Sequence, residues 1–399
     1  MSTTPPPTED VEVEFNDDIE VIEANDAVQL FSQHSSSIYS LASAPEGQFH
    51  GLIASGAGDD CAFLWDVFSG TSLAQLSEFN DSVVACEFST DSTYLAVGSL
   101  DGVVKVWSVE ALVHSASLPD KQTVPDPVCE LNDFGDTLLS LQWHPKGNFL
   151  LVGSGPTAFM YAIPQGTCSR VFAGPDGEVT SLLWANNGKL VVTGHENGAL
   201  ALFSPRDASC LARMNPGTVA DPRSTGTDLV VTCLTVHDQS KMIAIGDEVG
   251  MVSLFKMVDG QLRRLHCQKV HADSVESLHF VQQGSWLLSA STDETLLLFD
   301  VKHNSVRFQL NLGAAATGCS VGLFDGIACA YAMLVSGSIA VVDLGKGCLI
   351  TSIDGHNSPI LTHCFGPSNV LVVGADDGNI LVFAPGSIPD EEDENEVME

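Results

Sequence analysis

A pattern of forty-odd residues repeats along this 399-residue chain and constrains its fold more than any other feature. In each copy, a turn that is usually rich in Asp and Gly precedes a short apolar run, and we call the last residue of that run the anchor. The spacings between successive anchors are 42, 54, 42, 52, 44, 43 and 41 residues, which defines eight units. The anchors are Trp65, Trp107, Tyr161, Phe203, Phe255, Phe299, Val342 and Phe383.

Further short apolar runs lie upstream of each anchor, as at residues 82–88 and 94–98 of the second unit. Alternating β-branched and apolar residues between turns predict strands, and four strands per unit at this period predict a propeller blade. We therefore predict an all-β fold with an eight-bladed propeller over residues 27–386. Residues 26–34 are expected to form the outer strand that completes the last blade and the loop that leads into the first, because an open ring leaves unpaired strand edges. The two long spacings predict polar, Pro-containing insertions near residues 117–133 and 214–227.

Three features of these units resemble the WD40 family: a Trp-Asp pair, a Gly-His pair and an Asp six residues before the anchor. The resemblance covers nearly the whole chain and implies a β-propeller of four-stranded blades. The third and seventh units depart from it, because residues 153–156 and 335–338 lack the turn acid. The residues that carry the resemblance are Trp65-Asp66, Gly355-His356, Asp59, Asp101, Asp293 and Asp377.

Ser, His and Asp recur together and allow two interpretations, a catalytic triad or a structural network. The WD40 resemblance implies a network of hydrogen bonds, and its recurrence favours that interpretation, since a catalytic site is needed only once. The chain has no phosphate-binding GxxxxGK[ST] loop and no HExxH motif. We therefore predict no catalysis, cofactor or metal. The network residues are His34, Ser55, Asp59 and Trp65 in the first unit, His271, Ser289, Asp293 and Phe299 in the sixth, and Asp101, Trp107, His356, Asp377 and Phe383 elsewhere.

The chain is strongly acidic, with 16 Lys and Arg against 51 Asp and Glu and a formal charge of −35. This balance argues against nucleic-acid binding, which needs a basic face, and against anionic membrane surfaces. Residues 1–26 and 387–399 hold nine and seven acids and no Lys or Arg. We expect both tails to be disordered and solubilising, or alternatively to extend an acidic capture surface.

The eleven cysteines form no CxxC pair, so neither a zinc ribbon nor a disulfide framework is predicted. The N-terminus lacks the basic and apolar regions of a signal peptide, and no apolar stretch approaches the length of a membrane span. We expect a monomer in a reducing compartment, in the cytoplasm or also in the nucleus.

Acids in the turns between second and third strands, and in the loops leading into first strands, are expected on one face of the propeller. There they would form an acidic basin suited to a Lys- and Arg-rich peptide. The alternative is that acids dominate everywhere and this face is not special. The predicted binding residues are Asp60, Glu78, Asp81, Asp136, Asp176, Glu178, Glu196, Asp247, Glu248, Asp273, Glu276, Glu294 and Asp376.

The acidic N-terminal arm, the eight units and the run from Gly58 to Trp65 (GDDCAFLW) resemble the angio-associated migratory cell protein group. That group includes a fungal dedicated chaperone of a large-subunit ribosomal protein of the L-ten family. The resemblance implies a non-enzymatic, cytoplasmic escort that captures the basic N-terminus of its newly made client during ribosome biogenesis. The alternatives are a general WD40 scaffold in signalling or ubiquitin ligation and a binder of histone tails. Apolar groups near the channel would set the peptide's register, and the sequence does not identify them.

Overall fold

The computed structural model describes residues 26–118, 124–135, 137–174, 177–214 and 229–384. Apart from Asp26, both acidic tails lie outside these residues, as does most of the second insertion. The predictions made for them are therefore not tested. No helix among the described residues is long and apolar enough to cross a membrane. All eleven cysteines are free.

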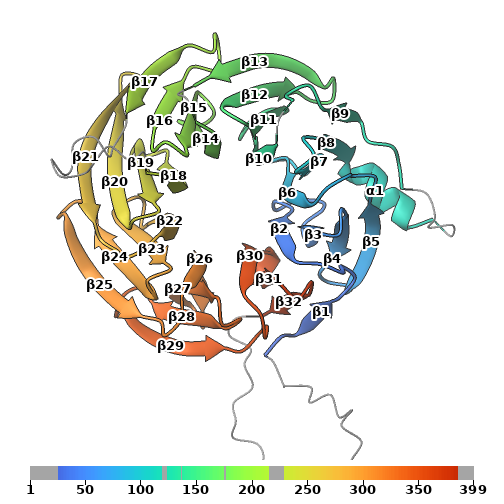
Figure 1. Ribbon diagram of the computed structural model, residues 1–399. Helices are drawn as coiled ribbons and strands as arrows, with labels where there is room; N and C mark the ends of the chain where they lie inside the picture. Colours follow the sequence, from blue (N-terminus) through green and yellow to red (C-terminus); the bar gives the residue numbers. More distant parts are fainter. Residues whose placement is uncertain (1–25, 119–123, 136, 175–176, 215–228, 385–399) are drawn as a thin grey trace, which may run out of the picture.

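Eight antiparallel four-stranded sheets form a ring, which confirms the predicted propeller (Figure 1). We number the sheets as blades 1–8 and call their strands a to d from the channel outwards. The first four blades contain β2 (Ile38–Ser43), β3 (Leu52–Ala57), β4 (Ala62–Asp66), β5 (Thr71–Leu76); β6 (Val83–Phe88), β7 (Tyr94–Ser99), β8 (Val104–Ser108), β9 (Cys129–Leu131); β10 (Leu138–Trp143), β11 (Phe149–Ser154), β12 (Thr157–Ala162), β13 (Thr167–Ala173); and β14 (Val179–Ala185), β15 (Leu190–His195), β16 (Leu200–Phe203), β17 (Cys210–Met214).

The other four blades follow the same order, except that the last takes its outer strand from the start of the chain. They contain β18 (Val231–His237), β19 (Met242–Asp247), β20 (Met251–Val258), β21 (Gln261–Lys269); β22 (Val275–Val281), β23 (Trp286–Ser291), β24 (Thr295–Asp300), β25 (Ser305–Asn311); β26 (Ala316–Phe324), β27 (Ile327–Leu334), β28 (Ile339–Asp343), β29 (Cys348–Ile353); and β30 (Ile360–Phe365), β31 (Leu371–Ala375), β32 (Ile380–Phe383), β1 (Gln29–Phe31). A short 3-10 turn (Pro367–Asn369) joins β30 to β31.

The ring closes where β1 pairs with β32, with Leu30 opposite Leu381. The predicted closing strand is therefore confirmed, although it spans only three residues. Phe31 is buried, and its ring centroid lies 4.6 Å from that of Trp65 in blade 1. This contact joins the outer strand of blade 8 to blade 1, so the closure is both hydrogen-bonded and packed.

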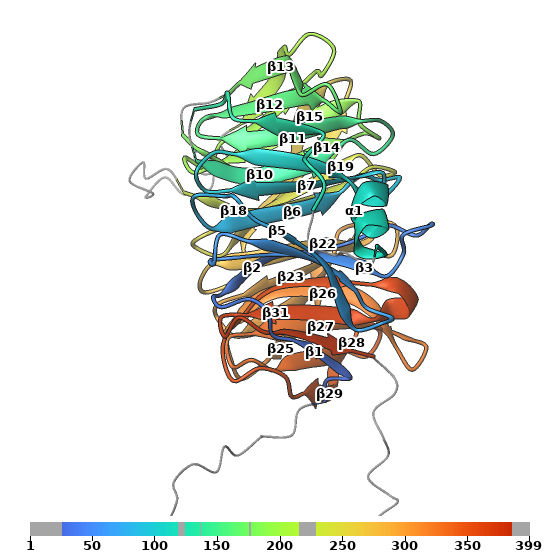
Figure 2. The same ribbon diagram turned by 90° about the vertical axis from the view of Figure 1, so that its right-hand side faces the viewer.

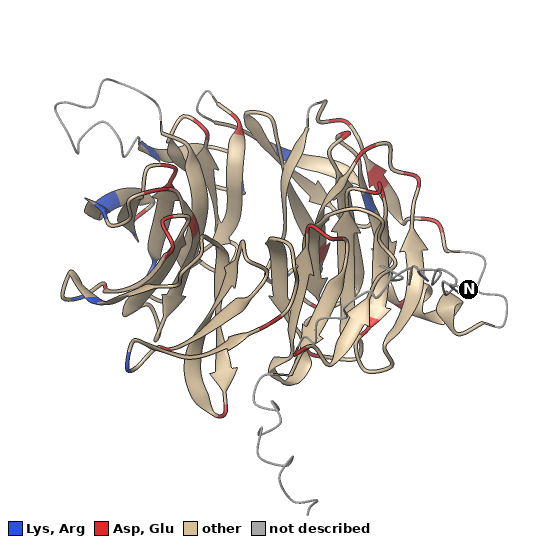
Figure 3. Ribbon diagram, turned by 60° about the horizontal axis from the view of Figure 1, so that its bottom comes forward, with Lys and Arg blue, Asp and Glu red and all other residues tan. Residues whose placement is uncertain are grey.

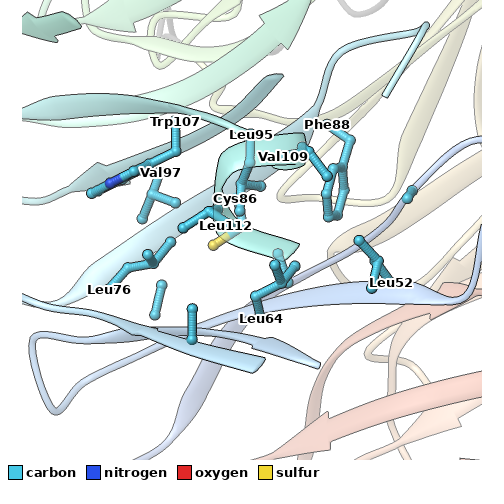
Figure 4. Close-up of a cluster of buried hydrophobic side chains, with 14 of the residues drawn as sticks. Leu52, Leu64, Leu76, Cys86, Phe88, Leu95, Val97, Trp107, Val109 and Leu112 are labelled. Carbon is cyan, nitrogen blue, oxygen red and sulfur yellow. The ribbon is translucent and has the colours of Figure 1, made fainter. Parts of the chain in front are cut away.

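Apolar side chains fill the spaces between neighbouring blades. Figure 4 shows one such cluster, in which side chains of blade 1 pack against side chains of blade 2. Burial of apolar surface at about 25 cal/mol per Å² is the main force that holds adjacent blades together. The labelled members are Leu52, Leu64, Leu76, Cys86, Phe88, Leu95, Val97, Trp107, Val109 and Leu112.

The same cluster includes α1 (Val109–Ala116), a helix that the sequence interpretation did not predict. It lies beside β5 on the outside of the ring (Figure 2). Ser108 caps its start by accepting a hydrogen bond from the Ala111 amide, and Leu112 is fully buried. The insertion expected near 117–133 therefore begins after this helix, and its last part forms β9.

The innermost strands expose a backbone edge to the channel, and side chains of the preceding blade satisfy some of its amides. Glu87 Oε2 accepts from the Trp143 amide at 2.8 Å, and Gln142 Oε1 accepts from the Trp184 amide at 3.2 Å. These bonds link blade 2 to blade 3 and blade 3 to blade 4 through equivalent positions.

Candidate functional site

The turns between strands b and c and the connections from strand d to the next strand a lie at the same end of the ring. We call this end the loop face. It carries the Ser-His-Asp groups and most of the acids that the sequence singled out, so both are described here in turn.

A chain of hydrogen bonds connects four residues of blade 1. Trp65 Nε1 donates to Ser55 Oγ at 2.8 Å, and Ser55 Oγ lies 2.8 Å from His34 Nε2. His34 Nδ1 lies 3.0 Å from the Asp59 carboxylate. The Asp59 carboxylate can only accept, so Nδ1 of His34 carries the proton, and Nε2 of the neutral ring accepts from the Ser55 hydroxyl. Asp59 also accepts from the Ser35 amide at 2.9 Å.

Blade 6 contains the same arrangement without the indole. His271 Nε2 lies 2.8 Å from Ser289 Oγ, and its Nδ1 lies 3.2 Å from the Asp293 carboxylate and 2.9 Å from Thr295 Oγ1. The anchor is Phe299, which is buried and whose ring has no hydrogen-bond donor. The hydroxyl of Thr295 supplies a further partner on the Asp293 side.

The other blades keep only parts of this network. In blade 2, Asp101 accepts from the amide and side chain of Asn80, and Trp107 Nε1 donates to the Pro125 carbonyl at 3.0 Å. In blade 8, where the anchor is Phe383, His356 pairs with Asp377 at 3.0 Å, and His356 Nε2 has no partner among the described residues. Val373 occupies the position that Ser55 holds in blade 1, so no hydroxyl is available there.

Blade 4 has a version of the network that the sequence interpretation missed. His195 lies at the end of strand β15, with Nε2 2.8 Å from Thr193 Oγ1 and Nδ1 3.0 Å from the Gly177 carbonyl. Gly174 makes room for this ring, because a Cβ there would come within 3.0 Å of it. The sequence signal that could have predicted this network is a Thr followed two residues later by a His, Thr193 and His195, on strand b.

The burial of these Ser, His and Asp groups suits a structural role. Ser55 is fully buried and Ser289 nearly so, so neither hydroxyl can reach a substrate carbonyl. Burial lowers the pKa of His34 and of His271, against the pull of Asp59 and Asp293, so both imidazoles are neutral near pH 7. Among the described residues, no group of three or more His, Cys, Asp or Glu side chains is placed to hold a metal ion.

Several of the predicted binding acids have partners within the fold. Glu78 lies 3.8 Å from Lys105 Nζ, and Asp376 accepts from Ser37 Oγ at 2.6 Å. Asp247 accepts from the amides of Val249 and Met251, and burial raises its pKa. The other members of this group, Asp81, Glu248 and Asp273, each accept a hydrogen bond from a backbone amide.

Other predicted binding acids have no hydrogen-bond or ion-pair partner for their carboxylates among the described residues. These are Asp60, Glu178, Glu196, Glu276 and Glu294. Four of them lie in loops of blades 1, 4 and 6, whereas Glu276 lies within strand β22 and not in the predicted loop. It is the extra residue of a bulge between Val275 and Ser277. Asp136 and Asp176 lie outside the described residues.

Basic residues are unevenly distributed around the ring. Residues 26–104 and 347–384, which form the outer strand of blade 7, blade 8, blade 1 and the first two strands of blade 2, contain thirteen acids and no Lys or Arg. Figure 3 shows acidic residues (red) in many loops and few basic residues (blue). The potential on this side of the ring is therefore negative, and Lys105 beside Glu78 offsets only part of it.

The family model described as "WD domain, G-beta repeat" matches residues 25–66, 70–108, 166–204, 262–300 and 347–383. With eight four-stranded blades in a closed ring, the chain is a β-propeller with WD40 repeats.

Within that class it is homologous to angio-associated migratory cell protein. The human protein is 26% identical over 364 residues, which cover 88% of this chain and 77% of the human protein. An uncharacterized WD repeat-containing protein of Schizosaccharomyces pombe is 27% identical over 382 residues, covering 94% of this chain and 91% of that protein.

Solved structures of Sqt1 share the fold. The Saccharomyces cerevisiae protein superposes with a TM-score of 0.79 at 17% identity, covering 91% of this chain and all of the other. Sqt1 from Chaetomium thermophilum, crystallised bound to the N-terminus of the ribosomal protein L10, superposes with a TM-score of 0.76 at 19% identity, covering 90% of this chain and all of the other.

Proposed function

We propose that this chain is a non-enzymatic binding protein that captures the basic N-terminal segment of a newly made ribosomal protein of the L10 kind on its loop face. In this proposal the chain acts as a dedicated chaperone in the cytoplasm. The observation that carries it is the set of unpartnered carboxylates on that face, in a chain with a formal charge of −35. The fold shared with L10-bound Sqt1 supports this choice of client.

The physical chemistry of the loop face suits such a client. A segment whose Lys and Arg evolved to contact ribosomal RNA binds stray nucleic acid unless its charges are covered. Unpartnered carboxylates attract it over long range and speed the encounter. Because exposed ionic contacts are screened and exchange readily, the client can still be passed to the far more negative ribosome.

Charge reversal on the loop face tests the proposal. Glu178→Lys, Glu196→Lys and Glu294→Lys combined should weaken binding of an L10 N-terminal peptide at least tenfold and leave the melting temperature nearly unchanged. Glu294 has a positive φ, and Lys keeps a similar unbranched side chain there. The matched control reverses three exposed acids elsewhere, Glu46, Glu110 and Glu130, for the same change in net charge.

The two sets of variants separate the outcomes. Loss of binding with the loop-face set alone supports the proposal. Equal loss with both sets means that only net charge matters, and unchanged affinity with the loop-face set overturns the proposal. In either case the general WD40 scaffold, which needs no basic client, becomes the better hypothesis.

A further inference from the structure

Every innermost strand has the same irregularity where it leaves the loop face. In all eight blades, the pairing between strands a and b shifts by one residue immediately after its first pair. The extra residue of such a bulge is unpaired, and bulges commonly re-aim a side chain. In blade order these residues are Tyr39, Val84, Leu139, Thr180, Thr232, Glu276, Thr317 and Leu361.

The bulge residues divide the channel rim into two arcs. Leu361, Tyr39, Val84 and Leu139 belong to blades 8, 1, 2 and 3, whose innermost strands β30, β2, β6 and β10 are successive neighbours. The bulge residues of the other four blades are three threonines and Glu276. We call the first four residues the apolar crescent.

The crescent is accessible. Tyr39 is 44% exposed, Leu361 is 38% exposed and Leu139 is 37% exposed, while Val84 is half-buried. The Tyr39 ring lies against Gly58, where a Cβ would come within 3.2 Å of Cε2, so the ring sits beside the turn that carries Asp59 and Asp60. Large apolar side chains grouped on a soluble surface indicate a contact site.

The surroundings of the crescent specify the kind of partner. Three of its residues lie in the two stretches of chain that contain no Lys or Arg. The neighbouring turns carry Asp60 in blade 1 and Asp376 in blade 8. A segment that lies on the crescent therefore meets apolar side chains bordered by carboxylates.

We propose that the apolar crescent is a specificity site for a basic segment that also carries large aliphatic or aromatic side chains. This inference rests on the proposed function and adds to it. The acids attract any basic segment, whereas the crescent selects those whose apolar residues fit between its basic ones. Discrimination against purely polar basic segments then comes from apolar burial, since carboxylates cannot distinguish one cationic segment from another.

The test combines variants of the protein with variants of the peptide, measured by calorimetric titration with the full chain. Tyr39→Ser and Leu361→Ser together remove two exposed apolar groups. The control, Thr180→Ser and Thr317→Ser, changes the other arc but keeps the hydroxyls that donate to the carbonyls of Gly194 and Met333. The peptides are the L10 N-terminal segment and a copy whose aliphatic and aromatic residues are replaced by Ser.

We expect the affinity of the crescent variant for the native peptide to be at least about tenfold lower than that of the wild type. The factor should be the same at low and at high salt, because salt does not screen apolar contacts. The control should bind as the wild type does, and the substituted peptide should not distinguish crescent variant from wild type. If the wild type and the crescent variant bind the native peptide with equal affinity, the apolar crescent is not a specificity site, and the proposed function is not contradicted. No binding of the native peptide to the wild type overturns both.

Discussion

The Nδ1 atom of His34 lies 3.0 Å from Oδ1 of Asp59, a residue 25 positions further along the chain. This contact ties the segment that enters blade 1 to the turn between β3 and β4. His34, Asp59, Ser55 and Trp65 form a continuous chain of hydrogen bonds. This chain holds the four side chains in one arrangement. Its members stabilise the loop face on which a partner would bind.

Removing the acid of this chain of hydrogen bonds should destabilise the fold. Asp59→Ala orphans His34 Nδ1 and the Ser35 amide, so we expect the free energy of unfolding to fall by about 1–3 kcal/mol. Urea denaturation measures the change. Asp60→Asn is the matched control, because it keeps a residue type that tolerates the positive φ at this position and removes only the charge. If Asp59→Ala is as stable as the control, Asp59 is not structural.

The buried histidines should make the fold sensitive to acid. Because burial lowers the pKa of His34 and His271 below 6.5, the folded chain binds fewer protons than the unfolded chain below that pH. Stability is therefore present above about pH 6.5 and declines as the pH falls. Denaturation curves at successive pH values should show a shallower decline for His271→Gln than for the wild type. A parallel decline would contradict this role.

Glu87 should have the opposite effect at higher pH. Burial raises its pKa from 4.5 to about 8, so between these values the folded chain holds a proton that the unfolded chain has lost. Its contribution to stability therefore decreases as the pH rises from 4.5 to 8, by up to about 1.4 kcal/mol per pH unit. Glu87→Gln should remove this dependence and be the more stable protein at pH 8, since Gln142 already makes the equivalent bond in blade 3. Identical pH profiles would show that Glu87 is ionised in the fold.

Ring closure should depend on one side chain of β1. Phe31→Ala removes the contact with Trp65 and should cost about 3 kcal/mol or more, measured by urea denaturation. Leu30→Ala on the same strand should change stability by no more than about 0.5 kcal/mol, because Leu30 is 58% exposed. If Phe31→Ala and Leu30→Ala lower the free energy of unfolding by similar amounts, β1 closes the ring through its backbone hydrogen bonds alone.

The repeat predicted the architecture because turn residues and alternating apolar runs are local features of the sequence. Even blades 3 and 7, whose turns lack the acid, form regular sheets (β10–β13 and β26–β29). Helix α1 was missed because only Val109 and Leu112 mark its buried side in a short segment. Glu276 was assigned to a loop because a bulge depends on the register between two strands. The pairing of Glu78 with Lys105, 27 residues apart, likewise requires the folded ring.

The most direct test of the central claim is a calorimetric titration of the full chain with an L10 N-terminal peptide at low and at high salt. The account predicts one-to-one binding that weakens steeply with salt and is markedly weaker for a histone-tail peptide of equal charge. No binding, or equal binding of both peptides, would contradict it.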